Sequence, residues 1–212
     1  MKKTILTAIL ALFFVGCSQT SSVMTLDPYI AHGIKTKNPN SVHINSVQDK
    51  RENKSTIATV KDGNGNVMEY ITLQNSLSAW FSDAIKQELI ARGVSIDESA
   101  ESKVNIEIGK LRAQIEGYSK ENMSGYGEIF ITIYKGNETI TRQVRQTQSE
   151  FAPIRTGGAL TPFVKELLND LVAKSTEQII NSLYFANLNW QIRRISQNEV
   201  RKLRSFFIWH NL

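Results

Sequence analysis

Two stretches of the chain repeat apolar side chains every three or four residues, the spacing of one face of an α-helix. The first covers residues 76–93. Its apolar positions are Leu77, Trp80, Phe81, Ala84, Ile85 and Leu89. The second opens at Thr161-Pro162 and runs to residue 183. Its apolar positions are Phe163, Leu167, Leu168, Leu171, Val172, Ile179, Ile180 and Leu183. A capping residue or a first-turn proline begins each stretch, so we predict two long helices, each with one buried face.

Alternating apolar and polar positions predict strands before the first helix. Residues 41–48 form one candidate, and residues 56–60 and 67–71 form a pair. Residues 62–66 lie between the pair and read Asp-Gly-Asn-Gly-Asn, a sequence that favours a hairpin turn. A phosphate-binding loop would need a helix after the glycines, and here a strand follows. We therefore predict a hairpin.

The alternation resumes after the first helix over 104–115, 129–134 and 139–147, with a polar turn expected over 117–127. The alternation of apolar and polar positions shifts by one residue at Gly109-Lys110, as one extra residue in a β-bulge would produce. We summarise the order as ββαβββα. It predicts an α+β fold, a two-layer sandwich in which two long helices cover one face of a mostly antiparallel sheet.

The start of the chain has the layout of a secretory signal. Lys2 and Lys3 precede an apolar run that closes with Gly16-Cys17. The run is too short for a transmembrane helix. Cys17 is the single cysteine, and its place after a small residue predicts acylation by a diacylglyceryl thioether and an N-acyl group. Two or three acyl chains make membrane attachment durable. The alternative is an ordinary secreted protein in which Gly-Cys occurs by chance.

These observations divide the chain into four parts. We assign residues 1–16 to a signal peptide and 17–40 to the lipidated N-terminus and a flexible tether rich in turn formers. Residues 41–183 form a periplasmic α+β domain. Residues 184–212 form a C-terminal extension that is either basic and amphipathic or partly disordered. Ser18 is not the aspartate that retains lipoproteins in the inner membrane, so we expect an outer-membrane location facing the periplasm of a Gram-negative bacterium.

The basic composition belongs to the extension. The chain has a formal net charge of +5, but residues 41–183 carry 16 basic and 18 acidic side chains, a net of −2. The extension carries five basic side chains and one acidic side chain. A folded domain near neutrality does not attract nucleic acid, so we expect no nucleic-acid partner. The extension has the composition of a segment that lies on anionic lipid or docks a partner.

We find no catalytic or metal-binding motif. His32, His43 and His210 are the only histidines, and none has a metal-ligand spacing to another His, Cys, Asp or Glu. Nucleophile-elbow, Ser-x-x-Lys and Walker patterns are absent. The remaining carboxylates occur in a polar connector (Asp97, Glu98 and Glu101) or alternate out of strands (Glu107 and Glu116). We therefore expect no catalytic residues, no metal and no cofactor.

Several segments resemble the YajG-type family of bacterial outer-membrane lipoproteins. They are the segment around Cys17, residues 76–94 with Glu-Leu-Ile-Ala-Arg-Gly at 88–93, the strand 104–108, and the final helix over 164–180 with its Asn169-Asp170 step. The resemblance covers residues 1–183. It implies an outer-membrane location and this fold, but no reaction.

The sequence thus predicts a lipid-anchored, non-enzymatic envelope protein. It would contact membrane lipid through acylated Cys17 and serve as an accessory or binding subunit for another envelope component. The alternative is a carrier of a small ligand such as a lipid or a peptidoglycan fragment, which needs a cavity between helices and sheet. An enzyme of unrecognised type is the third hypothesis.

Overall fold

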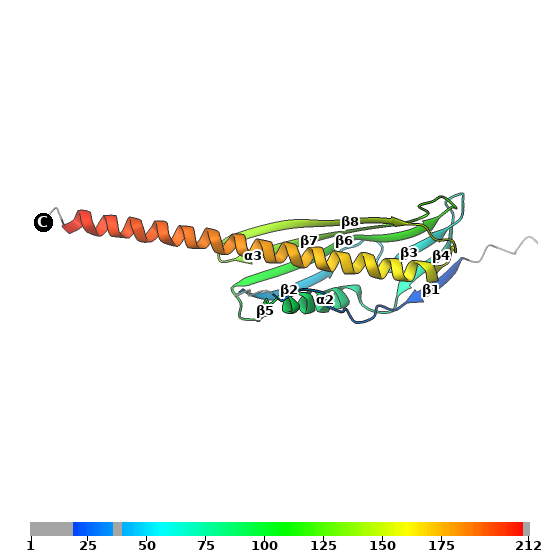
Figure 1. Cartoon of the computed structure of the whole chain (residues 1–212), viewed down its shortest axis with the longest axis horizontal. Coiled ribbons are helices and arrows are strands. Elements are labelled where there is room, and N and C mark those ends of the chain that lie inside the picture. Colours follow the sequence, from blue (N-terminus) through cyan, green and yellow to red (C-terminus); the bar gives the residue numbers. More distant parts are fainter. Residues whose placement is uncertain (1–18, 36–39, 210–212) are drawn as a thin grey trace, which may run out of the picture.

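The computed structural model of the chain describes residues 19–35 and 40–209, with side chains described up to Tyr184. Within these residues the chain forms eight strands and two helices (Figure 1). They are β1 (Thr20–Met24), β2 (Ser41–Asp49), β3 (Thr56–Lys61), β4 (Val67–Leu73), α2 (Leu77–Ala91), β5 (Ser95–Ile96), β6 (Ser102–Glu116), β7 (Met123–Lys135), β8 (Glu138–Glu150) and α3 (Gly157–Trp209).

The strands form one sheet around β6. On one edge of β6, β7 pairs antiparallel and β8 continues the meander. On the other edge, β2 pairs parallel with residues 103–108 and β3 pairs parallel with residues 113–116. The predicted hairpin of β3 and β4 is confirmed as an antiparallel pair. β1 and β5 add parallel pairs at the margins, beside β4 and β2.

The α+β class is confirmed, but two details of the predicted fold are wrong. Four of the seven neighbouring pairs among the described strands are parallel, so the sheet is mixed rather than mostly antiparallel. Four strands precede the first helix, since β1 adds to the three predicted segments, and four strands follow it, so the order ββαβββα does not hold. β3 and β6 are connected through α2, and a connection of this kind places the two strands side by side in parallel. Local periodicity identifies strands but not their partners.

Both helices lie on one face of the sheet (Figure 1). α2 begins with the predicted cap, since Ser76 Oγ accepts from Ala79 N at 3.4 Å. It ends before Gly93, whose φ of 86° suits glycine. The core between the two layers includes fully buried Phe81 and Phe163 and the isoleucines of β6 and β7.

The phase change in β6 is confirmed as a bulge, because the register with β7 shifts between Ile108 and Lys110. Gly109 fits there because a Cβ at this position would lie 2.7 Å from Phe130 Cε2. The expected turn over 117–127 is shorter than predicted, since β7 already begins at Met123. Gly125 and Gly127 are strand residues that let α3 approach closely, and a Cβ at Gly125 would lie 2.7 Å from Phe163 Cε1.

α3 begins four residues before the predicted start at Thr161-Pro162. Glu69 of β4 decides this position, because its Oε2 accepts from Gly157 N at 2.9 Å. A carboxylate at a helix N-terminus satisfies a free N–H group and favours the helix dipole. Glycine at 157 leaves room for this carboxylate, since a Cβ would lie 2.5 Å from Glu69 Oε1.

The predicted tether over 17–40 is wrong for its middle part. Residues 20–24 form β1 on the edge of β4, and Leu26 and Tyr29 are buried in the core. Apolar side chains in this segment are too sparse to show a period, and they are buried only because β4 and α2 receive them. At the other end, the α3 backbone continues through the predicted extension to Trp209, beyond the sheet (Figure 1).

Candidate functional site

The structure separates the residues that the sequence analysis considered for chemistry. Cys17 and His210 lie outside the described residues, so acylation of Cys17 stays a prediction. His32 lies between β1 and β2, and His43 lies in β2. Asp97 forms a turn by accepting from the N–H and hydroxyl of Ser99, both at 2.8 Å. Within residues 19–35 and 40–209, no group of three or more His, Cys, Asp or Glu side chains is arranged to hold a metal ion.

Two other carboxylates have structural roles. Asp62 holds the β3–β4 turn, where its Oδ1 accepts from Asn64 N at 2.8 Å and Asn66 N at 2.9 Å. Hydrogen bonds from Asn66 are the main reason that the pKa of Asp62 is below its ordinary value. Glu116, at the end of β6, pairs with Lys61 at 3.6 Å. The glycine-rich loop is thus a hairpin turn, as predicted.

A buried carboxylate fastens residues 25–35 to α2, a feature that the sequence analysis missed. Glu88 is fully buried. It accepts from Tyr29 Oη at 3.0 Å, from His32 N at 3.0 Å and from Arg92 Nε at 2.8 Å. Burial alone would raise the pKa of Glu88, but these three hydrogen bonds together lower it. Burial and the Glu88 carboxylate raise the pKa of Tyr29.

Trp80 strengthens the same attachment. It belongs to the predicted apolar face of the helix but is only partly buried, and Phe81 is the fully buried aromatic residue of α2. Trp80 Nε1 donates to the Asp27 carbonyl at 2.7 Å, and its ring meets Tyr29 edge-on at a centroid distance of 6.2 Å. Lys165 of α3 also pairs with Asp27, at 2.5 Å. Residues 25–35 therefore connect both helices.

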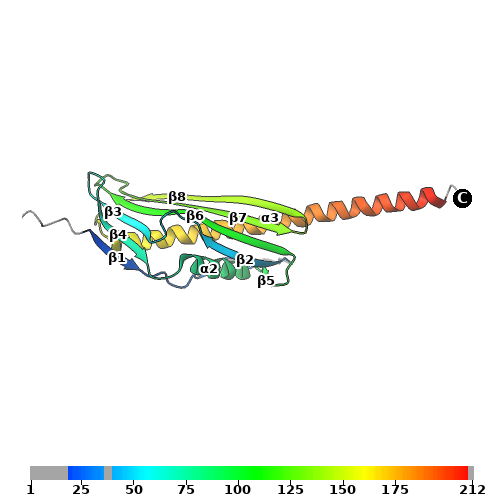
Figure 2. The ribbon, with the colours of Figure 1, turned by 180° about the vertical axis from the view of Figure 1, so that it is seen from behind.

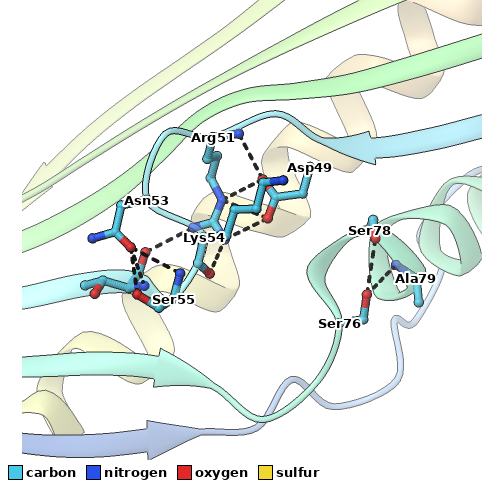
Figure 3. A network of polar contacts seen from close by, with 9 residues as sticks. Asp49, Arg51, Asn53, Lys54, Ser55, Ser76, Ser78 and Ala79 are labelled. Carbon is cyan, nitrogen blue, oxygen red and sulfur yellow. Dashed lines mark hydrogen bonds and ion pairs between the residues drawn. The ribbon is translucent and has the colours of Figure 1, made fainter.

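A groove of about 600 Å³ opens between the loop after β2 and the start of α2. Arg51 shapes this loop (Figure 3). Its side chain, only 4% exposed, pairs with the Asp49 carboxylate at 2.9 Å. It also donates to the Lys54 and Thr56 carbonyls. Across the groove, Ser76 Oγ lies 3.1 Å from Ser78 Oγ. Because Asp49 is engaged by Arg51, the groove presents mainly ammonium, amide and hydroxyl groups.

The face of the sheet opposite the helices, here called the outer face, is a second candidate surface (Figure 2). Its side chains alternate with the core residues of β6, β7 and β8. They include Lys103, Lys110, Arg112, Tyr126, Glu128, Phe130, Tyr134, Gln143 and Arg145. No described helix covers these side chains, so they meet solvent or a partner.

Glu128 organises the outer face. It is only 4% exposed although it lies on an uncovered surface, because neighbouring side chains converge on it. It accepts from Gln143 Nε2 at 2.6 Å and from Arg145 Nε at 2.9 Å, and Lys110 Nζ lies at 3.5 Å. The hydrogen bond from Arg145 is the largest cause of the lowered pKa of Glu128. Beside it, the Arg112 guanidinium lies 5.8 Å from the centre of the Tyr126 ring.

These arrangements are suited to recognition. A general acid at neutral pH needs a raised pKa, whereas Glu88 and Glu128 are stabilised as anions. The hydrogen bonds to these carboxylates hold the donor side chains in fixed positions, which lowers the entropy cost of binding a partner.

Over the part of the chain that the structure describes, no helix is long and apolar enough to cross a membrane.

A model for a family of uncharacterised lipoproteins matches residues 31–185. The chain belongs to this family. The protein is therefore a lipoprotein of unknown function, and its family indicates a membrane-associated location in the cell envelope. No curated protein matches the chain significantly.

One of three similar solved structures supports the fold. Protein XCC0632 from Xanthomonas campestris has a TM-score of 0.56 and 10% identity, covering 79% of this chain and 99% of its own. The rare lipoprotein B of Shewanella oneidensis has a TM-score of 0.42 and 10% identity, covering 63% and 98%. A minor lipoprotein of Acinetobacter baumannii has a TM-score of 0.39 and 16% identity, covering 63% and 94%. At these identities the likeness of XCC0632 concerns the fold alone, and the other two are too distant to carry an argument.

Proposed function

We propose that this lipoprotein is held in the outer membrane by acylated Cys17 and acts without catalysis, as an accessory subunit that binds another envelope protein through its outer face. The resemblance of its segments to the YajG-type family supports the outer-membrane address. β1 begins at Thr20, so only two residues, Ser18 and Gln19, lie between the acylated cysteine and the sheet, a span of three Cα-to-Cα steps. At about 3.5 Å per residue, that keeps the domain within about 10 Å of the anchor.

The ordered outer face is the observation that carries this proposal. Arginine and tyrosine are enriched in protein interfaces, and here Arg112, Tyr126 and Arg145 stand together on an uncovered sheet. Glu128 fixes Arg145 in place, so a partner meets side chains that are already ordered. By contrast, the layer between helices and sheet is filled by buried side chains such as Phe81 and Phe163. That packing favours a binding subunit over a small-ligand carrier.

Crosslinking in intact envelopes tests the proposal. Lys103 and Arg112 are exposed on β6 and belong to the outer face. We expect Lys103→Glu combined with Arg112→Glu to abolish a specific crosslink to an envelope protein that the wild type forms. The matched control is Glu166→Lys, an exposed charge reversal on α3, which should retain the crosslink. The absence of any reproducible envelope protein in the wild-type sample would refute the proposal, as would equal recovery with both variants.

A further inference from the structure

β8 is a long edge strand with an open side. It pairs with β7 along all 13 of its residues and with no other described strand. Its sequence, ETITRQVRQTQSE, contains no proline, glycine or lysine, and its register with β7 shows no bulge. Edge strands are usually protected from pairing by these devices, by charged side chains or by a covering segment. The four charged side chains of β8 have both signs, so they can form ion pairs with those of a suitable partner strand. The open edge of β8 is therefore suited to receive another strand.

The hairpin turn determines which residues of β8 face outward. Gly136 and Asn137 form a two-residue loop closed by the pair Lys135 and Glu138. In such a hairpin the closing pair exchanges both backbone hydrogen bonds. The even-numbered residues of β8 therefore direct their N–H and C=O groups to β7. The odd-numbered residues, from Thr139 to Ser149, direct theirs to the open edge.

We propose that β8 pairs antiparallel with β8 of a second copy of this chain, forming a continuous sheet across a two-fold axis. Only the odd-numbered residues direct their backbone N–H and C=O groups to the open edge of β8. In the hydrogen-bonded pairs of the dimer, an odd-numbered residue of one copy must therefore face an odd-numbered residue of the other. Even-numbered side chains then also face each other. Because even-numbered residues such as Val144 point to the helix side, the helices of both copies lie on the same face.

Charge and length of overlap together favour one register. Centring the pair on Ile140 would set Arg142 against Glu138, but over only five residues of β8, whereas centring it on Gln146 pairs nine. When Gln146 faces its own copy, Arg142 faces Glu150 twice, and no like charges meet. Centring the pair on Val144 would place Glu138 against Glu150. Centring it on Arg142 or Arg145 would place an arginine against itself, and opposite like charges destabilise a strand pair. Centring it on Gln143 brings no like charges together, but it forms no ion pair.

The position of α3 agrees with this pairing. α3 lies over both β7 and β8, since Leu171 packs on Gly127 and Gln146 Nε2 donates to Asp170 at 2.8 Å. Strands are spaced about 4.8 Å apart. Two α3 helices placed over the β7–β8 pair of each copy would then lie roughly 10 Å apart, the distance at which helices pack. This interface is formed through the backbone edge of β8, where Gln143 and Arg145 of the outer face would lie beside Ser149 and Thr147 of the second copy. It is argued from the strand edge and does not rest on the proposed function.

Disulfide formation in intact envelopes tests the proposal. Residue 146 would face its own copy in a pair without backbone hydrogen bonds, where Cβ atoms are closest. We expect full-length Gln146→Cys to form a dimer of twice the chain mass on non-reducing gels. Gln148→Cys, on the same face, would lie several residues from its copy and should crosslink about tenfold less, because disulfides need Cα atoms within about 7 Å. The wild type, with Cys17 alone, gives the background.

Two further measurements identify the partner and the register. Co-expression of Gln146→Cys chains with a short and a long tag should give an intermediate mixed dimer, which only a second copy explains. Added Arg142→Glu should reduce the crosslink severalfold, and Arg142→Glu with Glu150→Arg should restore it. A monomer with Gln146→Cys, a crosslink to a different protein, or stronger crosslinking at Gln148→Cys would overturn the proposal.

Discussion

Two carboxylates show how single residues acquire a role from their surroundings. Glu88 is buried beneath the segment after β1, and Glu128 lies in the open face of the sheet. Both are surrounded by donors that come from other parts of the chain. A buried carboxylate is costly without such partners, and removing its hydrogen bonds leaves the cost uncompensated.

Glu88→Gln should therefore destabilise the protein. The substitution keeps the size of the side chain but removes the charge that receives the hydrogen bonds of Tyr29, His32 and Arg92. Hydrogen bonds to charged groups contribute about 1.5–3 kcal/mol, so we expect the free energy of unfolding to fall by about 2 kcal/mol in urea titrations. Asp83→Asn, on the exposed side of α2, is the control and should change it by less than about 0.5 kcal/mol. Equal effects of the two would contradict the role of Glu88.

Acid should weaken the fold through the same groups. The folded-state pKa values of Glu88 and Glu128 are lowered from the ordinary value of 4.5. Below that pH the unfolded chain takes up protons first, so the stability present at neutral pH is lost as pH falls through the folded-state pKa values. We expect the urea midpoint to decline below about pH 4.5, and to decline less steeply in Glu88→Gln. An identical pH profile in the variant would show that Glu88 does not contribute.

At the scale of elements, the packing of α3 on β7 depends on missing side chains. Gly125 and Gly127 lie within β7, between β6 and β8, where glycine otherwise weakens a strand. Phe163 and Leu171 fill the space that their Cβ atoms would occupy. The glycines lower the β-strand propensity of β7, but they allow a closer contact between the sheet and α3.

Gly127→Ala should disrupt this contact. The added Cβ would collide with the buried Leu171 side chain, and overpacking of a core costs about 1–3 kcal/mol. Thermal unfolding should detect the loss, and a second substitution, Leu171→Val, should recover part of it. Gly63→Ala is the matched control, because a Cβ there has no heavy atom within 4 Å. A stable Gly127→Ala protein would mean that the two layers are less closely packed than the structure shows.

At the scale of the whole molecule, the short connection between Cys17 and β1 limits how far the domain can lie from a lipid anchor. The sheet begins at Thr20, so an acylated cysteine would hold the domain against the membrane surface rather than at the end of a long tether. α3 starts at Gly157, near β1 and β4, and continues past the far end of the sheet (Figures 1 and 2). At 1.5 Å per residue its 53 residues extend for about 80 Å.

Cys17→Ala should release the protein from the membrane. We expect the wild type to incorporate labelled palmitate and to sediment with outer membranes, and the variant to lose both properties because no acyl chain can attach. Ser18→Asp is the matched variant. It should keep the label but move to the inner-membrane fraction. A wild type that is unlabelled and freely soluble would rule out the anchor.

The sequence alone determined the local elements of this protein. Both helices, the β3–β4 hairpin and the bulge at Gly109 were predicted, because periodicity, capping and glycine chemistry act over a few residues. Only the tertiary structure decided the strand partners, the burial of the segment after β1, and the candidate surfaces. The Tyr29–Glu88 hydrogen bond joins residues 59 positions apart, and Glu69 reaches Gly157 across 88 positions. Such contacts form only when the fold brings distant segments together, and a local sequence pattern does not predict which segments those are.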